Sequence, residues 1–157
     1  MPASVRNPAF EAELGVVIGK KAKNVNTADA EKYILGYTLA NDVTAKDHLV
    51  KGMPWSKGKS FDTFTPVGPY LVTGIDPGNL AVKCSVNGQV KQDENTADMV
   101  FSVSELVSFL SAIMTLEPGD LILTGTPPGG GELNDGDLVE CSSPLLGNLA
   151  NKARFVR

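Results

Sequence analysis

Residues 11–19, Glu-Ala-Glu-Leu-Gly-Val-Val-Ile-Gly, predict a strand, because they are rich in β-branched residues and end in glycine. Residues 14–18 are almost wholly apolar, which is typical of a strand buried on both faces. Alternate residues of a strand point to the same face, so Glu11 and Glu13 are expected to stand side by side. Two such carboxylates repel each other unless a cation or a proton compensates. The alternative is a solvated edge strand, on which this repulsion is weak.

The segments that follow this strand are expected to form a helix, a second strand and a loop in turn. Thr27 can cap a helix over residues 27–35. Residues 36–44 are expected to form the second strand, in which the polar pair Asn41-Asp42 lies near the end. Residues 45–64 are expected to form a loop, because glycine and proline interrupt them.

The clearest local signal is Asn87-Gly88, which lies between two alternating segments and predicts a hairpin with a type I′ turn. Ser102 and Glu105 form a capping-box pattern, which predicts the start of a helix. Behind it, five apolar residues fall at helical spacing and are expected to face the core: Leu106, Val107, Leu110, Ile113 and Met114. Further strands are expected over residues 121–124, 137–142 and 149–156. Many short strands with two short helices predict a β-rich α+β fold.

The composition excludes several classes of protein. The chain has 157 residues, the length of one domain, and 42% of them are hydrophobic, which excludes a disordered chain. A net charge of −4 disfavours nucleic acids and anionic membranes as partners, because both require a clustered positive surface. Residues 1–10 lack the apolar segment of a secretory signal. Because Cys84 and Cys141 are expected to be reduced, the expected compartment is the cytoplasm.

Asp42 is a third acidic residue near the end of a predicted strand. Together with Glu11 and Glu13 it would make an all-oxygen, triply anionic site, which suits a hard cation such as Mg²⁺ or Mn²⁺. Zinc is disfavoured, because no Cys/His ligand spacing occurs and His48 is the single histidine of the sequence. The alternative is that Asp42 is an ordinary turn or capping residue.

Two further segments carry candidate polar groups. Lys59 lies in a tight loop next to Gly58, where a lysine is most often solvated. Gly125 and Thr126 open a glycine-rich segment that could present backbone N–H groups to an anion. This segment lacks the Lys-Ser/Thr pair of a phosphate-binding loop, which disfavours nucleotide binding. A glycine-rich turn without a ligand is the alternative interpretation.

Read in order, these motifs resemble the fumarylacetoacetate hydrolase family. The resemblance rests on residues 11–20, 36–45, 59–62, 87–88 and 123–127, and it extends from about Phe10 to the C-terminus. It implies a mixed, rolled or barrel-like β-sheet around the site. It also implies an N-terminal arm over residues 1–10, a catalytic domain over residues 11–157, and a homodimer or larger assembly.

The resemblance implies a role for each candidate residue. By motif position, Glu11, Glu13 and Asp42 match the family's metal-binding carboxylates, with Mg²⁺ or Mn²⁺ as cofactor. Lys59 matches the active-site lysine, and Thr126, next to Gly125, matches the threonine that helps to hold the substrate carboxylate. The family often has arginine where this chain has Lys46. Lysine keeps the charge for substrate binding but loses the bidentate fork of arginine.

The expected function is that of a metal-dependent enzyme acting on a small 2-oxo (1,3-dicarbonyl) acid. It would hydrolyse a C–C bond or isomerise its substrate through a metal-stabilised enolate. The first alternative is an oxaloacetate decarboxylase or tautomerase. Family members normally carry a further segment before the paired glutamates, whereas ten residues precede Glu11 here. The second alternative is therefore a non-catalytic metal-binding domain or fragment without that segment's lid.

Overall fold

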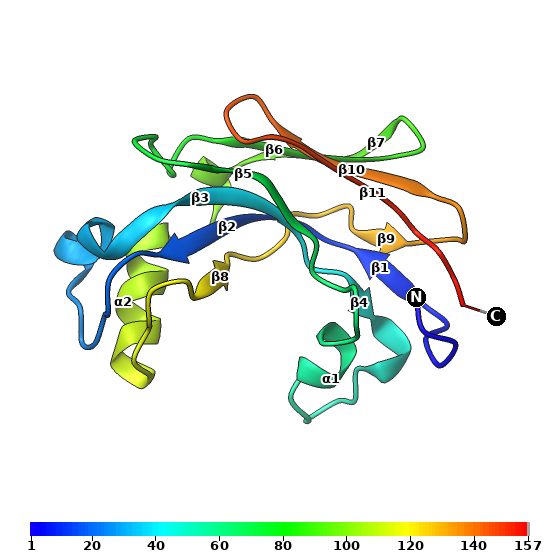
Figure 1. Cartoon of the computed structure of the whole chain (residues 1–157), viewed down its shortest axis with the longest axis horizontal. Coiled ribbons are helices and arrows are strands. Elements are labelled where there is room, and N and C mark those ends of the chain that lie inside the picture. Colours follow the sequence, from blue (N-terminus) through cyan, green and yellow to red (C-terminus); the bar gives the residue numbers. More distant parts are fainter. Residues whose placement is uncertain (157) are drawn as a thin grey trace.

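The computed structural model describes residues 1–156, and its strands form three small antiparallel sheets (Figure 1). The first sheet has the strand order β4 (Thr44–Ala45), β1 (Pro8–Phe10), β9 (Gly131–Glu132). The second has the order β5 (Val67–Val72), β3 (Ile34–Asn41), β2 (Ala12–Ile18), β8 (Leu121–Leu123). The third has the order β11 (Gly147–Lys152), β10 (Leu138–Ser143), β6 (Ala81–Val86), β7 (Gln89–Asn95). The predicted β-rich α+β class is confirmed.

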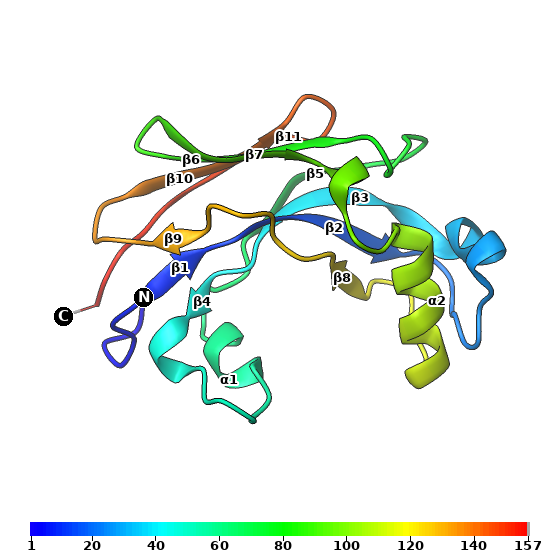
Figure 2. The same ribbon diagram turned by 180° about the vertical axis from the view of Figure 1, so that it is seen from behind.

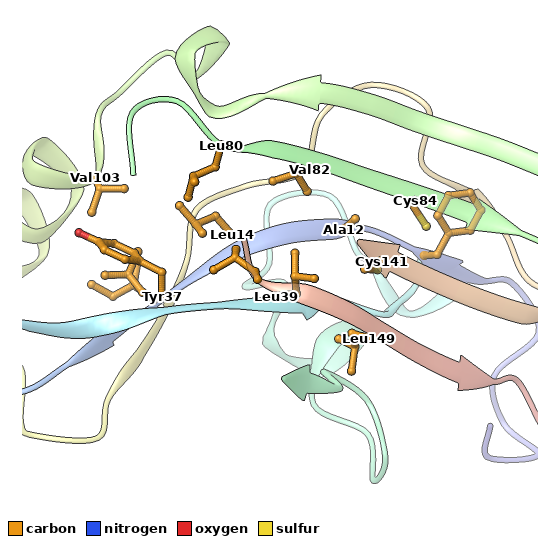
Figure 3. Packing of buried hydrophobic residues seen from close by; sticks show 14 of the residues in the cluster. Ala12, Leu14, Tyr37, Leu39, Leu80, Val82, Cys84, Val103, Cys141 and Leu149 are labelled. Atoms are coloured by element: carbon orange, nitrogen blue, oxygen red, sulfur yellow. The ribbon is translucent and has the colours of Figure 1, made fainter. Parts of the chain in front are cut away.

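Strand β2 forms where it was predicted and is a central strand of its sheet, paired with β3 and β8. Its apolar residues are buried because the third sheet covers one of its faces, as both views of the ribbon show (Figures 1 and 2). In the core, Leu14 and Leu39 from this sheet lie close to Leu80 and Val82 (Figure 3). Burial of each such large side chain contributes about 1.5–3 kcal/mol. β1 lies within the expected N-terminal arm and is fully buried.

The capping box at the start of helix α2 (Val103–Ile113) is confirmed. The Ser102 hydroxyl accepts from the Glu105 N–H at 3.3 Å, and the Glu105 carboxylate accepts from the Ser102 N–H at 2.7 Å. The prediction that the whole apolar stripe faces the core was wrong, because Ile113 and Met114 are 60% and 52% exposed. The buried positions are Val103, Val107 and Ser111.

The burial of the polar residue Ser111 accounts for the face that α2 turns toward the core. Its hydroxyl is fully buried, accepts from the Val25 N–H at 2.9 Å and donates to the Ser108 carbonyl at 2.9 Å. A hydroxyl that pairs with the main chain in this way can occupy the core, although a count of apolar residues does not identify it.

Two local predictions before β5 were wrong. Residues 27–35 do not form an α-helix capped by Thr27: a 3-10 helix, η1 (Thr27–Tyr33), follows Asn26, which makes no side-chain cap bond, and leads directly into β3. Residues 45–64 are not wholly loop, because they contain the short helices η2 (Lys46–His48) and α1 (Ser56–Lys59). Gly58 permits α1, since a Cβ there would lie 2.5 Å from Leu49 Cδ2.

The predicted hairpin is confirmed in β6 and β7. Asn87 and Gly88 both have positive φ, 51° and 78°, as a type I′ turn requires. A third 3-10 helix, η3 (Thr96–Asp98), follows β7, and β10 forms close to its predicted position. The strand predicted over residues 149–156 is only partly right, because β11 begins at Gly147 and ends at Lys152. Within residues 1–156, none of the helices combines the length and the apolar character needed to span a membrane.

Candidate metal and substrate site

The three acidic residues of the sequence prediction converge at one end of β2 and β3. Ala12 pairs with Asn41 in the antiparallel ladder, so Glu11 and Asp42 meet just beyond it, where the Asp42 N–H donates to the Glu11 carbonyl at 2.8 Å. One carboxylate oxygen from each of Glu11, Glu13 and Asp42 lies within 4.8 Å of the others. The strand alternation that places Glu11 and Glu13 on one face therefore creates a cluster, and not a solvated edge.

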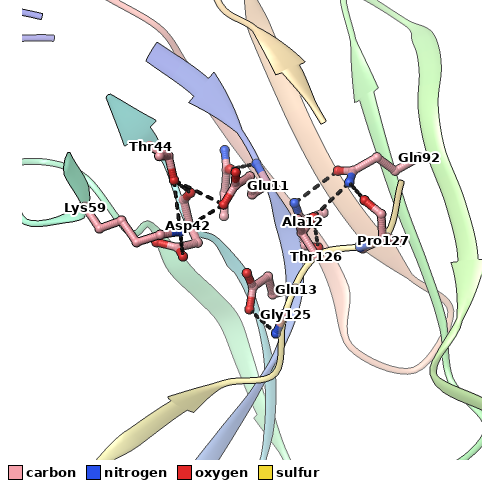
Figure 4. Close-up of polar contacts among 11 residues, drawn as sticks. Glu11, Ala12, Glu13, Asp42, Thr44, Lys59, Gln92, Gly125, Thr126 and Pro127 are labelled. Carbon is pink, nitrogen blue, oxygen red and sulfur yellow. Dashed lines mark hydrogen bonds and ion pairs between the residues drawn. The ribbon is translucent and has the colours of Figure 1, made fainter. Parts of the chain in front are cut away.

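Lys59 enters this cluster from helix α1 (Figure 4). Its ammonium donates to Oε2 of Glu11 at 2.9 Å, to a carboxylate oxygen of Asp42, and to the Thr44 hydroxyl at 3.0 Å. Burial lowers the pKa of Lys59, but the bonds to Asp42 and Glu11 outweigh burial and raise it above its ordinary value. Lys59 therefore stays positively charged across the neutral range.

Glu13 is the most deeply buried of the three acids, at 4% exposure. Burial raises the pKa of Glu13 from its ordinary value of 4.5 to about 7, against the opposing effect of a hydrogen bond from the Gly125 N–H. That bond is 2.6 Å long, and the neighbouring Asp42 carboxylate raises the pKa further. Glu13 therefore carries a proton in part of the molecules at neutral pH, unless a cation replaces it.

The donor set fits a divalent metal ion. With all three acids ionised, the three carboxylates and the ammonium of Lys59 sum to a charge of −2, which one dication would neutralise. Carboxylate oxygens are the ligands that Mg²⁺ and Mn²⁺ prefer. Zinc suits the site poorly, since His48 lies elsewhere, with Nε2 2.9 Å from the Ser4 carbonyl.

A cavity of about 330 Å³ lies over the cluster. Gly125 and Thr126 line it together with the acids and Lys59. Lys46 is not among the described residues that line it, and its side chain is exposed in η2. The structure therefore does not bring Lys46 to the other candidates.

Sequence reasoning missed two polar residues at the site. Thr44 interacts through its hydroxyl with Glu11 at 3.1 Å and with the Asp42 carbonyl at 2.9 Å, and it also accepts from Lys59. The sequence could have indicated Thr44, because it lies two residues after Asp42, and alternate residues of an extended chain share a face. Gln92 lies 80 residues from Ala12 in the sequence, yet it contacts the Ala12 backbone. Nothing in a single sequence indicates that contact.

Residues 1–154 match the model of the family described as "Fumarylacetoacetate (FAA) hydrolase C-terminal". Among curated relatives, the chain is 45% identical over 163 residues to the mitochondrial oxaloacetate tautomerase fahd2 of Xenopus laevis, covering 96% of this chain and 51% of that protein. The chain spans only 54–61% of the length of three other curated relatives that it matches.

Two solved structures are closely similar to the chain. The 5-carboxymethyl-2-hydroxymuconate delta-isomerase from Mycobacterium smegmatis is 43% identical with a TM-score of 0.97, covering 100% of this chain and 62% of that chain. Fumarylpyruvate hydrolase from Pseudomonas aeruginosa, in complex with Mn²⁺ and pyruvate, is 33% identical with a TM-score of 0.94, covering 99% of this chain and 70% of that chain.

Proposed function

The chain belongs to the fumarylacetoacetate hydrolase family, and from this premise we propose that it forms the catalytic part of a divalent-metal-dependent enzyme for a small 2-oxo acid. The single observation that carries the proposal is the ammonium of Lys59, which lies between the carboxylates of Glu11 and Asp42 in the wall of a cavity. We assign the catalytic domain to residues 11–157.

Glu11, Glu13 and Asp42 would hold Mg²⁺ or Mn²⁺, and the fumarylpyruvate hydrolase structure with Mn²⁺ supports this assignment. When bound, the cation would supply Lewis-acid stabilisation of negative charge on the substrate's 2-oxo and carboxylate oxygens. Lys59 contributes a permanent positive charge beside the same position. A preorganised donor of this kind is worth about 3–4 kcal/mol to a transition state that develops negative charge.

The reaction is one that passes through an enolate. The bond that breaks is one made by the carbon next to the oxo group. A proton lost from that carbon passes to a base, a carboxylate is lost as CO₂, and an acyl group leaves as a carboxylic acid after water has added to its carbonyl. In each case the electron pair moves toward the 2-oxo oxygen, where Lys59 would stabilise the charge. Gly125 and Thr126 line the same cavity and would bind the substrate's carboxylate. Keto–enol isomerisation needs no further reactant, whereas hydrolysis of an acylpyruvate needs an activated water.

Relatives of both kinds occur, since one is named as an oxaloacetate tautomerase and another as a fumarylpyruvate hydrolase. The test is to assay oxaloacetate isomerisation, oxaloacetate decarboxylation and acylpyruvate hydrolysis in parallel with Mg²⁺ and with Mn²⁺. Turnover in any of the three supports the proposal and selects the reaction. A protein that binds the metal but turns over none of them refutes the catalytic proposal and favours a non-catalytic metal-binding domain.

We also propose that the protein acts as a homodimer in the cytoplasm. Phe109 and Ile113 on α2, and Met114 directly after it, are more than half exposed, which suits a face that a second copy covers. Cys84 and Cys141 are free thiols, as a reducing compartment favours. Analytical ultracentrifugation tests the dimer, and cell fractionation tests the location.

A further inference from the structure

Gln92 on β7 has a buried, fully hydrogen-bonded side chain near the candidate site. It is 1% exposed, and its amide makes three hydrogen bonds to two distant segments (Figure 4). Oε1 accepts from the Ala12 N–H at 3.1 Å, while Nε2 donates to the Thr126 hydroxyl at 2.8 Å and to the Pro127 carbonyl at 2.7 Å. The backbone partners determine the orientation of the amide, because an N–H can only donate and a carbonyl can only accept.

These bonds close into a ring. The Thr126 hydroxyl accepts from Gln92 and donates to the Ala12 carbonyl at 2.9 Å, so Gln92, Thr126 and both polar groups of Ala12 are linked in one cycle. The ring supplies hydrogen-bond partners for the N–H and the carbonyl of Ala12, at the edge of β2 that faces away from β3. β8 does not reach this point, because its pairing with β2 begins at Gly15.

The ring joins the two halves of the site. Ala12 lies between Glu11, which directly precedes β2, and Glu13, which lies on β2. Thr126 and Gly125 belong to the loop that lines the cavity. Gly125 itself donates to Glu13 at 2.6 Å. Gln92 therefore links the loop of Gly125 and Thr126 to β2 through hydrogen bonds, next to the bond between Gly125 and Glu13.

We infer that Gln92 is a positioning residue, which holds the loop of Gly125 and Thr126 at the distance from β2 that substrate binding requires. This inference rests on the proposed function. Gln92 does not line the cavity of about 330 Å³, so it acts through Thr126 and not by contact with substrate. Glu11 and Asp42, by contrast, are held to each other by a backbone bond and by Lys59, which do not involve Gln92. Glu13 is fixed by its place in the β2–β3 ladder, although it also accepts from Gly125 of the loop.

This difference predicts which binding step Gln92 controls. Gln92→Met keeps the length of the side chain but removes all three bonds, so the loop loses its link to β2. We expect the affinity of Mn²⁺-saturated protein for oxalate to fall about 10–100-fold, as for partners that orient a site from behind its contacts. We expect KM for oxaloacetate to rise by a similar factor. The affinity for Mn²⁺ itself and kcat should each stay within about threefold of wild type.

The experiment titrates Mn²⁺ and then oxalate into each variant by calorimetry, and it records the melting temperature and the kinetics with oxaloacetate. Gln89→Met is the matched control, because Gln89 lies on the same strand with an exposed side chain that accepts a hydrogen bond from Lys91. Gln92→Glu can keep the bond from the Ala12 N–H but loses the N–H donors to Thr126 and Pro127, so it replaces Gln92→Met if that variant does not fold.

The ring also predicts coupling between its members. Thr126→Val and Gln92→Met interrupt the same cycle. The double variant should therefore bind oxalate no more weakly than whichever single variant has the lower oxalate affinity. Folded variants at Gln92 with unchanged oxalate affinity would overturn the inference, as would a parallel loss of Mn²⁺ and oxalate affinity. Wild-type protein that binds neither Mn²⁺ nor oxalate refutes the proposed function first, and the inference with it.

Discussion

The ammonium of Lys59 lies 2.9 Å from Oε2 of Glu11, although 48 residues separate the two in the sequence. Lys59 is the last residue of helix α1, and Glu11 directly precedes β2. The contact makes Lys59 a resident cation among three carboxylates, and it leaves a net charge that a divalent ion would cancel. Metal binding, pH dependence and catalysis are consequently linked at this one point.

Lys59→Met should separate metal binding from turnover. The substitution removes the positive charge beside the reacting oxygen, and we expect kcat to fall about 10²–10³-fold, as for loss of one preorganised donor. Mn²⁺ affinity should be retained or strengthened, because the acids lose a competing cation. Lys57→Met on the exposed side of α1 is the control. Loss of Mn²⁺ binding in Lys59→Met would show that the lysine builds the site and does not act on substrate.

The metal-free protein should become less stable as the pH rises through the weakly acidic range. The fold raises the pKa of Glu13 from 4.5 to about 7, so the folded state holds this proton more tightly than the unfolded chain does. Stability from this group is full below about pH 4.5, falls as the pH rises to about 7, and is constant above. The loss is about 3–4 kcal/mol at most, since one pKa unit is worth about 1.4 kcal/mol.

Glu13→Gln should flatten this pH dependence, which chemical denaturation at a series of pH values would measure. Glu132→Gln is the control, because Glu132 is exposed on β9 and its removal changes the net charge equally. An unchanged slope in Glu13→Gln would assign the pH dependence to another group.

Addition of metal should stabilise the fold by mass action. Mn²⁺ at 100 times its dissociation constant stabilises a protein with one site by about 2.7 kcal/mol, provided that the unfolded chain does not bind it. We therefore expect the melting temperature to rise with Mn²⁺ or Mg²⁺ and to fall back with EDTA. Asp42→Asn should abolish this response, while Glu132→Gln should keep it. A melting temperature that ignores the metal would argue against the carboxylate site.

Gly58→Ala should displace α1. The added Cβ would lie 2.5 Å from Leu49 Cδ2 and 3.1 Å from the Ala45 carbonyl oxygen, so either the helix or Leu49 must move. Overpacking of this kind costs about 1–3 kcal/mol. Because Lys59 is the next residue, we expect kcat to fall together with stability. Ser60→Ala, at an exposed position just beyond the helix, should leave both unchanged.

Local features that depend on a few neighbouring residues were predicted correctly from the sequence. The type I′ turn at Asn87-Gly88 formed because these two residues tolerate positive φ, and the capping box formed because Ser102 and Glu105 satisfy each other's N–H groups. The strand over residues 12–18 followed from its continuous apolar sequence. The family could be recognised because five short motifs occur in order.

The sequence by itself therefore determined which residues form β2, the hairpin and the start of α2, and which side chains are acidic candidates. Only the tertiary structure decided that Ser111 would be buried in place of Ile113, that Lys46 would lie outside the cavity, and that Gln92 would hold Ala12 and Thr126 together. The physical reason is the separation along the sequence over which each interaction acts. Strand and turn preferences act between adjacent residues, whereas the buried side chains of Gln92 and Ser111 each have a partner that lies 80 or more residues away.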